Sequence, residues 1–314
     1  MYRYIIKRLL LMIPIIFGVI FIVFFILSIT PGDPGRLMLG MNAPQEAVEK
    51  LNEELGYNDP FFTRFFRYLG DLARGDFGIS YRSRQPVFNE IFSRFPVTLM
   101  LSLGTMAVTI LLGIPLGVLA AVKQYSKMDM ISTFTALLLA AAPSFWLALL
   151  MILLFSLKLG WLPPNGIGGI SNFIMPVLTQ AVIYAASALR MTRSTMLEAI
   201  RQDYVRTARG KGAPESRVIW RHAIRNALLP VVTTMGIYLS GMLGGTIIVE
   251  QVFGLPGLGT LVIKAILMKD IPQVMAVTIF LAIMFCIIML VVDLLYAFID
   301  PRIKARFATV RWRS

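Results

Sequence analysis

The chain has 314 residues, 57% of them hydrophobic and 15% charged, with a net charge of +13 and a pI near 10.1. An average soluble domain is about 45–50% apolar and about 25% charged. The composition therefore excludes an ordinary soluble enzyme, and it argues against a nucleic-acid-binding protein, whose basic patches interrupt a polar surface. The single cysteine, Cys286, excludes an internal disulfide, and His222 is the only histidine, so no zinc cluster is expected.

Six stretches are long and apolar enough to cross a membrane, which takes roughly 20 residues. We therefore predict an all-α polytopic membrane protein with six transmembrane helices. The first stretch follows three basic residues, as in a signal peptide, but its apolar run is too long and no small-residue cleavage site follows. The predicted spans are approximately Leu9–Ser28, Val97–Val122, Met130–Leu157, Phe173–Leu189, Ala227–Val249 and Val274–Ala297.

The distribution of lysine and arginine predicts the orientation of these spans. With a cytoplasmic N-terminus, the inner segments hold nineteen of the thirty basic residues but only five acids, whereas the outer segments hold eleven of each. Both termini are therefore predicted to be cytoplasmic. The inner segments are 1–8, 123–129, 190–226 and 298–314; the outer ones are 29–96, 158–172 and 250–273.

The outer segment 29–96 contains three apolar patterns with helical spacing. One begins after Pro44 and ends at Gly56, a second begins after Pro60, and a third, from Phe88 to Phe95, precedes Pro96. Aromatic-rich amphipathic helices of this kind pack over helix ends or lie at head-group depth. We favour packing and anchoring, with a docking surface for an external partner as the alternative.

The segment 190–226 is predicted to be a helix, a tight turn and a second helix. Good helix formers run from Glu198 to Arg209, and Gly210, Gly212 and Pro214 then interrupt them. Pro214 followed by Glu215 suits a first helical turn, where proline loses no hydrogen bond and the acid meets the helix dipole. The alternative is a generic basic loop near anionic lipid.

The fifth span and the outer segment that follows it contain further candidate residues. Small and hydroxyl residues on the span predict close helix packing, or the lining of a translocation path: Thr233, Thr234, Tyr238, Ser240, Gly241 and Gly245. Glycine and proline in the next segment predict an external gate or a plain connector: Gly254, Pro256, Gly257 and Gly259. Asp293 lies towards the cytoplasmic end of the sixth span, where pairing with an Arg or Lys is favoured over proton coupling.

The stretch from Asp203 to Val232 resembles the coupling loop of permease subunits in binding-protein-dependent, ATP-driven importers, and more narrowly that of the dipeptide/oligopeptide/nickel subfamily. Supporting stretches occur in order along the chain: Ile29–Pro34, Gly75–Ser80, Phe253–Gly259 and Asp293–Arg302. The broader importer pattern has a glutamate where this chain has Arg206, so no role for a glutamate is carried over.

This resemblance implies a type I ABC-importer permease fold, with a cytoplasmic coupling helix between spans 4 and 5 that centres on Lys211–Ser216. It implies four kinds of partner: a second homologous permease forming a heterodimer, two ATPase subunits, an external solute-binding protein and membrane lipid in a bacterial inner membrane. The implied ATPase-coupling residues are Arg206, Thr207, Ala208, Lys211, Gly212, Ala213, Pro214, Glu215 and Ser216.

The chain has no Gly-x-x-x-x-Gly-Lys-Ser/Thr motif for cradling ATP phosphates. We therefore expect ATP to be bound by the partner subunits, and we expect this chain to be a transport subunit with no enzyme activity and with no cofactor or metal of its own. Acid–base and metal-binding residues are too sparse on the predicted membrane faces to favour a membrane-bound enzyme.

The predicted function is the import of di- or oligopeptides delivered by an external binding protein. Nickel chelates, glutathione or other small solutes are alternatives within the same architecture, and an ion-coupled secondary carrier is a second alternative. The predicted divisions are 1–28 (N-terminus and first span), 29–96 (outer helical segment), 97–299 (five-helix permease domain) and 300–314 (basic tail).

Overall fold

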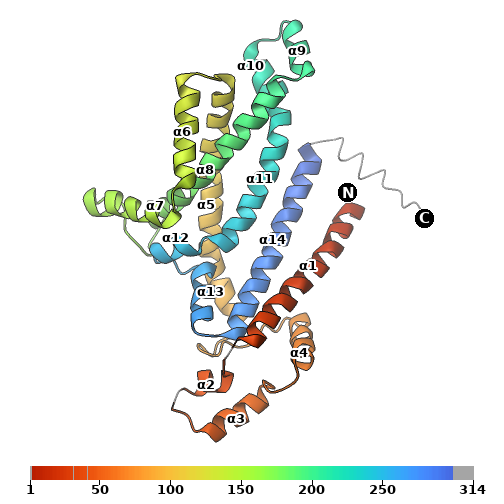
Figure 1. Cartoon of the computed structure of the whole chain (residues 1–314), viewed down its shortest axis with the longest axis vertical. Coiled ribbons are helices and arrows are strands. Elements are labelled where there is room, and N and C mark those ends of the chain that lie inside the picture. The colour runs from red at the N-terminus through yellow and green to blue at the C-terminus, as the bar shows by residue number, and fades with distance from the viewer. Residues whose placement is uncertain (1, 31, 41, 300–314) are drawn as a thin grey trace, which may run out of the picture. The chain divides into compact units, whose positions relative to one another are not determined.

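The computed structural model describes residues 2–30, 32–40 and 42–299, so the predicted basic tail 300–314 lies outside the described residues. The regular structure in these ranges is helical, with one strand-like bridge between Ile79 and Pro86 (Figure 1). The chain forms two compact units. The described part of unit 1 comprises 2–4, 99–255 and 287–299, and that of unit 2 comprises Ile5–Thr98 and Pro256–Cys286, apart from residues 31 and 41.

The helices follow one another along the chain with short connections. They are α1 (Tyr2–Ile29), α2 (Pro34–Leu39), α3 (Gln45–Glu54), α4 (Phe61–Ala73), α5 (Val87–Val122), α6 (Lys127–Ala141), α7 (Ser144–Met151), the π-helix η1 (Ile152–Lys158), α8 (Ser171–Ile200), α9 (Asp203–Gly210), α10 (Glu215–Arg217), the π-helix η2 (Val218–Ala223), α11 (Ile224–Gly245), α12 (Ile247–Val252), α13 (Leu258–Leu267) and α14 (Ile271–Ile299).

Five described helices are long and apolar enough to cross a membrane: Ile5–Ile29, Val87–Val122, Ser171–Ile200, Glu215–Gly244 and Ile271–Leu294. The third predicted span, Met130–Leu157, is not a single helix. Its two halves, Lys127–Ala141 and Ser144–Lys158, are bent by 103°. Ala142 is extended and Pro143 is the N-cap residue just before α7, because a residue before proline avoids the helical region and proline has no N–H to donate. The number of spans is six only if this bent pair counts as one.

The helices of unit 1 approach one another closely where one of them carries a glycine. A Cβ on Gly113 of α5 would lie 2.6 Å from the Cβ of Ala188 on α8, and one on Gly117 would lie 2.6 Å from Thr192. Likewise, a Cβ on Gly236 of α11 would lie 2.3 Å from Val292 of α14. These glycines let helices touch at backbone distance, as small residues do in membrane bundles.

In unit 2, the phenylalanines of α4 pack against the membrane helices. Phe65 is buried with Ile20 of α1 and with Met275 and Ile279 of α14. The helices predicted after Pro44 and Pro60 are confirmed as α3 and α4, and this packing supports the structural interpretation of the segment. The third pattern is not a separate helix, because it forms the first part of α5 and Pro96 lies within it. Apolar membrane helices tolerate such prolines.

The segment 29–96 also contains the pair of helices α2 and α3. The Asn52 side chain, which is buried, accepts a hydrogen bond from the backbone N–H of Gly35 at 2.8 Å and donates one to Asp33 at 2.8 Å. Asp33 in turn caps α2 by accepting from the N–H of Arg36. The buried side-chain amide of Asn52 thus links the start of α2 to α3 by hydrogen bonds.

Candidate coupling loop and α8–α11 groove

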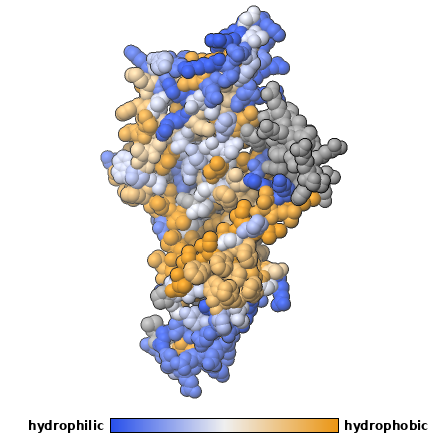
Figure 2. Space-filling model, turned by 45° about the vertical axis from the view of Figure 1, so that its right-hand side comes forward, coloured by the Kyte–Doolittle hydropathy of each residue, from blue (hydrophilic) through white to orange (hydrophobic). Residues whose placement is uncertain are grey.

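The loop between α8 and α11 projects from one end of unit 1 as α9, a turn and α10 (Figure 1). Figure 2 shows hydrophilic residues over this end of unit 1, at the top of the view. The predicted helix–turn–helix is therefore confirmed. The helix itself, however, is Asp203–Gly210, whereas residues 211–214 form the turn, so the prediction that a helix centres on Lys211–Ser216 is wrong.

The turn has the hydrogen bonds of a Schellman closure, which explains its glycine. The N–H of Gly212 donates to the carbonyl of Arg209 at 2.9 Å, and the N–H of Ala213 donates to that of Ala208 at 3.2 Å. This closure requires a left-handed residue, and Gly212 has φ +78°. Pro214 occupies the N-cap position just before α10, one residue before the first helical turn in which the sequence predicts it.

An ion pair braces the same turn from its exposed side. The Nε and Nη2 atoms of Arg209 donate to the two carboxylate oxygens of Glu215 at 3.0 and 2.6 Å. The hydrogen bond to Glu215 raises the pKa of the Arg209 guanidinium. The two side chains are about half exposed, so the ion pair contributes little to the stability of the fold. Its main effect is to fix the relative positions of α9 and α10.

An apolar cluster anchors the loop to the helices of unit 1. Val205 of α9 and Val218 of η2 are fully buried, and they pack with Val118 of α5 and Met196 of α8. Ala208 and Ala213, on either side of the turn, pack against the same cluster. The cluster therefore packs the loop directly against α5, α8 and α11.

The other predicted coupling residues remain at the surface. Arg206, Thr207, Lys211, Gly212, Pro214, Glu215 and Ser216 are all exposed. Two aromatic side chains missed by the sequence reasoning lie on the same loop: Tyr204 is 39% exposed and Trp220 is 54% exposed. The signal available in the sequence was a large aromatic residue within a strongly cationic loop.

A groove of about 520 Å³ lies in unit 1 between α6, α8 and α11. Its lining is polar: Thr133, Ser187, Arg190, Met191, Arg193, Ser194, Thr234 and Tyr238. Two of the predicted path residues, Thr234 and Tyr238, are among them. The ring of Tyr238 lies 5.2 Å from that of Tyr184 on α8, which holds it at the groove wall.

A buried ion pair fixes one side of this groove. Arg193 of α8 donates to both oxygens of Asp129 on α6, at 2.5 and 2.8 Å. The same carboxylate accepts from the N–H of Tyr125 at 3.0 Å and from the hydroxyl of Thr133 at 3.3 Å. The sequence reasoning missed this pair, because its members are 64 positions apart.

The remaining residues predicted for the path lie elsewhere on α11. Ser240 is buried and its hydroxyl donates to the carbonyl of Gly236, and the hydroxyl of Thr233 donates to that of Leu229. Gly241 is exposed, and a Cβ added to it would meet no described neighbouring element within 4 Å. Gly245 ends α11.

The residues predicted as an external gate lie in the sequence on both sides of Leu255, where the segment of unit 1 ends and a segment of unit 2 begins. In unit 1, Gly254 has φ +62° and follows α12. In unit 2, Gly257 precedes α13, Gly259 is buried in it, and the N–H of Leu258 donates to the Thr98 hydroxyl at 2.8 Å. Pro256 begins that part of unit 2.

Comparison with known proteins identifies the family. Residues 113–305 match the binding-protein-dependent transport system inner membrane component, and residues 1–102 match the N-terminal part of such membrane components. The chain is 40% identical over 315 residues to the oligopeptide transport system permease protein AppB of Bacillus subtilis (strain 168), covering 97% of this chain and all of that one. It is 41% identical over 304 residues to the glutathione transport system permease protein GsiC of Escherichia coli (strain K12), covering 97% and 99%.

Solved structures support the fold. An inward-facing structure of the MetNI methionine ABC transporter aligns with a TM-score of 0.58 at 18% identity, over 69% of this chain and 99% of that chain. An amino acid ABC transporter aligns with a TM-score of 0.51 at 17% identity, over 68% and 94%. The helical arrangement is thus the type I permease fold. The chain belongs to the family of binding-protein-dependent transport system inner membrane components, the permease subunits of ABC importers.

Proposed function

We propose that this permease imports short peptides and is driven by two separate ATPase subunits that dock on the loop 203–232. The observation that carries the proposal is that one pair of helices, α8 and α11, bears both the anchored loop and the groove. A second, homologous permease completes the pathway, and an external binding protein delivers the substrate. ATP is bound by the ATPase subunits, since this sequence lacks the phosphate-binding motif.

The proposed mechanism follows from the attachment of the loop. When the ATPases close on ATP, the loops of the two permeases move with them, and the apolar cluster around Val205 and Val218 transmits this movement to α8 and α11. The groove walls then move as rigid helices, as in other closures of packed elements. Family membership excludes the predicted alternative of an ion-coupled secondary carrier.

The exposed aromatic residues of the loop are the proposed anchors for the ATPase. Aromatic side chains carry much of the energy of protein interfaces, and Tyr204 and Trp220 stand among exposed arginines. We expect Trp220→Ala to lower the amount of ATPase that co-purifies with the permease by about tenfold or more. Trp161→Ala is the matched control, because Trp161 is 68% exposed outside the loop. Equal recovery of the ATPase with both variants would refute this docking surface.

The groove chemistry and the relatives support peptide substrates. The hydroxyls of Thr133, Ser187 and Thr234 donate within the chain, so their oxygens are left to accept hydrogen bonds from the N–H groups of a peptide backbone without selecting one side chain. Arg190 adds a cation, and no described carboxylate lies within 4.0 Å of it, so it is available to a substrate carboxylate. Glutathione, the substrate in the name of one relative, is the second candidate because it carries more than one carboxylate.

Uptake by the assembled transporter tests the function. Cells that express the permease with its partner subunits should accumulate labelled di- and oligopeptides, and Gly212→Val should abolish uptake while leaving the chain in the membrane. Valine strains the left-handed position that closes the turn. Wild-type uptake by Gly212→Val would refute coupling through this loop. Uptake of glutathione in preference to neutral peptides would select the second candidate.

A further inference from the structure

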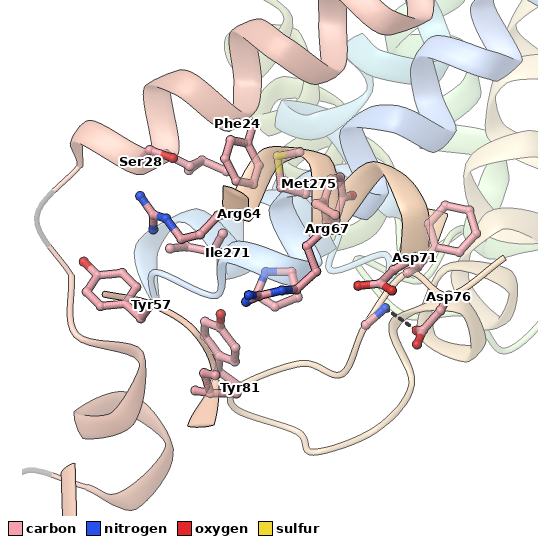
Figure 3. Close-up of a pocket in the computed structure, with 16 residues that line it drawn as sticks. Phe24, Ser28, Tyr57, Arg64, Arg67, Asp71, Asp76, Tyr81, Ile271 and Met275 are labelled. Atoms are coloured by element: carbon pink, nitrogen blue, oxygen red, sulfur yellow. Dashed lines mark hydrogen bonds between the residues drawn. The ribbon is translucent and has the colours of Figure 1, made fainter. Parts of the chain in front are cut away.

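A partly enclosed pocket of about 220 Å³ lies in unit 2 beside the C-terminal end of α1 (Figure 3). One wall is apolar, with Phe24 and Leu27 from α1 and Met275 from α14. The facing wall is polar and comes from α4 and from residues 76–81. The proposed transport mechanism uses no part of this pocket.

Arg64 brings an unsatisfied positive group into the pocket. Its Nε atom is buried without a hydrogen-bond partner among the described residues, and no described carboxylate lies within 4.0 Å of its guanidinium. The guanidinium carbon instead lies 5.4 Å from the centre of the Tyr57 ring. Leaving a buried donor without an acceptor is costly. A ligand that placed an oxygen atom at this end of the pocket would remove that cost.

Two tyrosine hydroxyls provide further donors. The hydroxyl of Tyr68, one turn along α4 from Arg64, is also buried without a described partner. Burial, together with the negative charge of Asp270, raises the pKa of Tyr81 to about 12, so its hydroxyl keeps its proton. Arg64, Tyr68 and Tyr81 thus form a set of donors that suits an oxyanion.

The opposite end of the pocket is acidic. Figure 3 shows Arg64 beside Tyr57 on one side and Asp71 with Asp76 on the other, with Arg67 between them. Arg67 is already paired with Asp59 at 2.6 Å, outside the pocket lining. Arg64 and Asp71 are two helical turns apart, about 10 Å along the axis. The lining therefore changes from cationic to anionic along α4, which suits a zwitterion better than a simple anion.

The position of the pocket along the membrane-spanning helix α1 indicates where such a zwitterion would come from. Phe24, Leu27 and Ser28 belong to the last two turns of a helix whose apolar span ends at Ile29. Lipid head groups lie at the ends of such spans. The surface of α1 next to the pocket is also apolar, with Phe25 and Ile26 about half exposed, so acyl chains can lie along it.

We propose that this pocket binds the head group of a zwitterionic aminophospholipid. Arg64, Tyr68 and Tyr81 donate hydrogen bonds to the phosphate, and Asp71 and Asp76 face the ammonium group. The pocket, at about 220 Å³, has room for about seven water molecules of about 30 Å³ each, which is close to the roughly eight non-hydrogen atoms of a phosphoethanolamine head group. The bound lipid ties α4 to the ends of α1 and α14.

Native mass spectrometry of the assembled transporter tests the proposal, with phosphatidylethanolamine and phosphatidylglycerol of identical acyl chains as probes. The wild type should retain phosphatidylethanolamine in preference to phosphatidylglycerol. Arg64→Gln should reduce its retention by about tenfold or more, because charge-assisted hydrogen bonds to phosphate are lost. Asp71→Asn should remove the preference between the two lipids but retain binding.

Arg74→Gln is the matched control, because it removes the same charge from the exposed end of α4, outside the pocket. It should bind lipid like the wild type. Added phosphatidylethanolamine should raise the melting temperature of the wild type but not of Arg64→Gln, which separates lost binding from misfolding. Equal retention by the wild type and Arg64→Gln would overturn the proposal, as would displacement of the lipid by a water-soluble dipeptide. Equal retention would leave the proposed peptide uptake untouched, whereas displacement by a dipeptide would assign the pocket to a peptide instead of a lipid.

Discussion

Asp129 joins two helices through a single carboxylate, which accepts hydrogen bonds from Arg193, the N–H of Tyr125 and the hydroxyl of Thr133. Asp129→Asn would leave Arg193 without its counter-charge. Removing one member of a buried ion pair costs about 3–5 kcal/mol, and we expect about 3 kcal/mol because Arg193 is 25% exposed. A lower melting temperature of the variant transporter in detergent, measured by fluorescence, checks this.

The double variant Asp129→Leu with Arg193→Met is the control for this prediction. It removes both charges, so no uncompensated ion stays buried, and apolar replacements of similar volume are tolerated at such sites. We expect its melting temperature to lie above that of Asp129→Asn. If Asp129→Asn melted like the wild type, the pair would contribute nothing to the contact between α6 and α8.

Asp33 couples the α2–α3 pair to pH. Burial alone would raise its pKa, but hydrogen bonds from Asn52 and from the N–H of Arg36 outweigh burial and lower the pKa below the usual 3.8. A carboxyl with a depressed pKa stabilises the fold above its unfolded pKa, and this stabilisation is lost as pH falls through the folded value. The amide of Gly35 should therefore lose protection against hydrogen exchange below about pH 4. Asp33→Asn keeps an acceptor but does not titrate, so a pH-dependent loss in that variant would contradict the assignment.

At the scale of elements, helix contacts depend on where glycine faces a neighbour. Gly236→Ala would place a Cβ 2.3 Å from Val292 and push α11 away from α14. We expect a loss of about 1–3 kcal/mol, typical of overpacking, seen as a lower melting temperature of the permease. Gly241→Ala is the control, since the added carbon would meet no described neighbouring element within 4 Å. Equal melting temperatures for both variants would argue against the contact.

The sequence correctly predicts those elements whose ends are set by a proline or glycine at the same position in the chain. The helices α3 and α4 begin directly after Pro44 and Pro60 as predicted, and Gly212 closes the turn after α9. The bend between α6 and α7 could not be predicted from hydropathy, because an apolar stretch has the same mean hydropathy whether straight or bent. Pro143 was a visible signal of this break. Pro96, however, lies within a continuous helix, so a proline by itself does not show whether an apolar helix is broken.

At the scale of the whole molecule, the groove of unit 1 is lined by residues that lie far apart in the sequence. The groove takes Thr133 from α6, Arg190 from α8 and Tyr238 from α11. Only the α11 residues stood out in the sequence, since hydroxyl groups in an apolar span are conspicuous there. Arg190 and Arg193 were counted as loop charges, because the sequence does not show that α8 continues to Ile200.

The unequal distribution of charge makes a prediction about the whole chain in the membrane. Because nineteen of the thirty basic residues lie in four of the seven predicted extramembrane segments, the positive-inside rule predicts that the loop 190–226 and both termini are cytoplasmic. In a Cys286→Ser background, without the ATPase subunits, Ser216→Cys and Asn58→Cys each place one exposed thiol on opposite sides. A membrane-impermeant maleimide should label Asn58→Cys in intact spheroplasts. It should label Ser216→Cys only after permeabilisation, and labelling of Ser216→Cys in intact spheroplasts would reverse the orientation and remove the loop from any cytoplasmic ATPase.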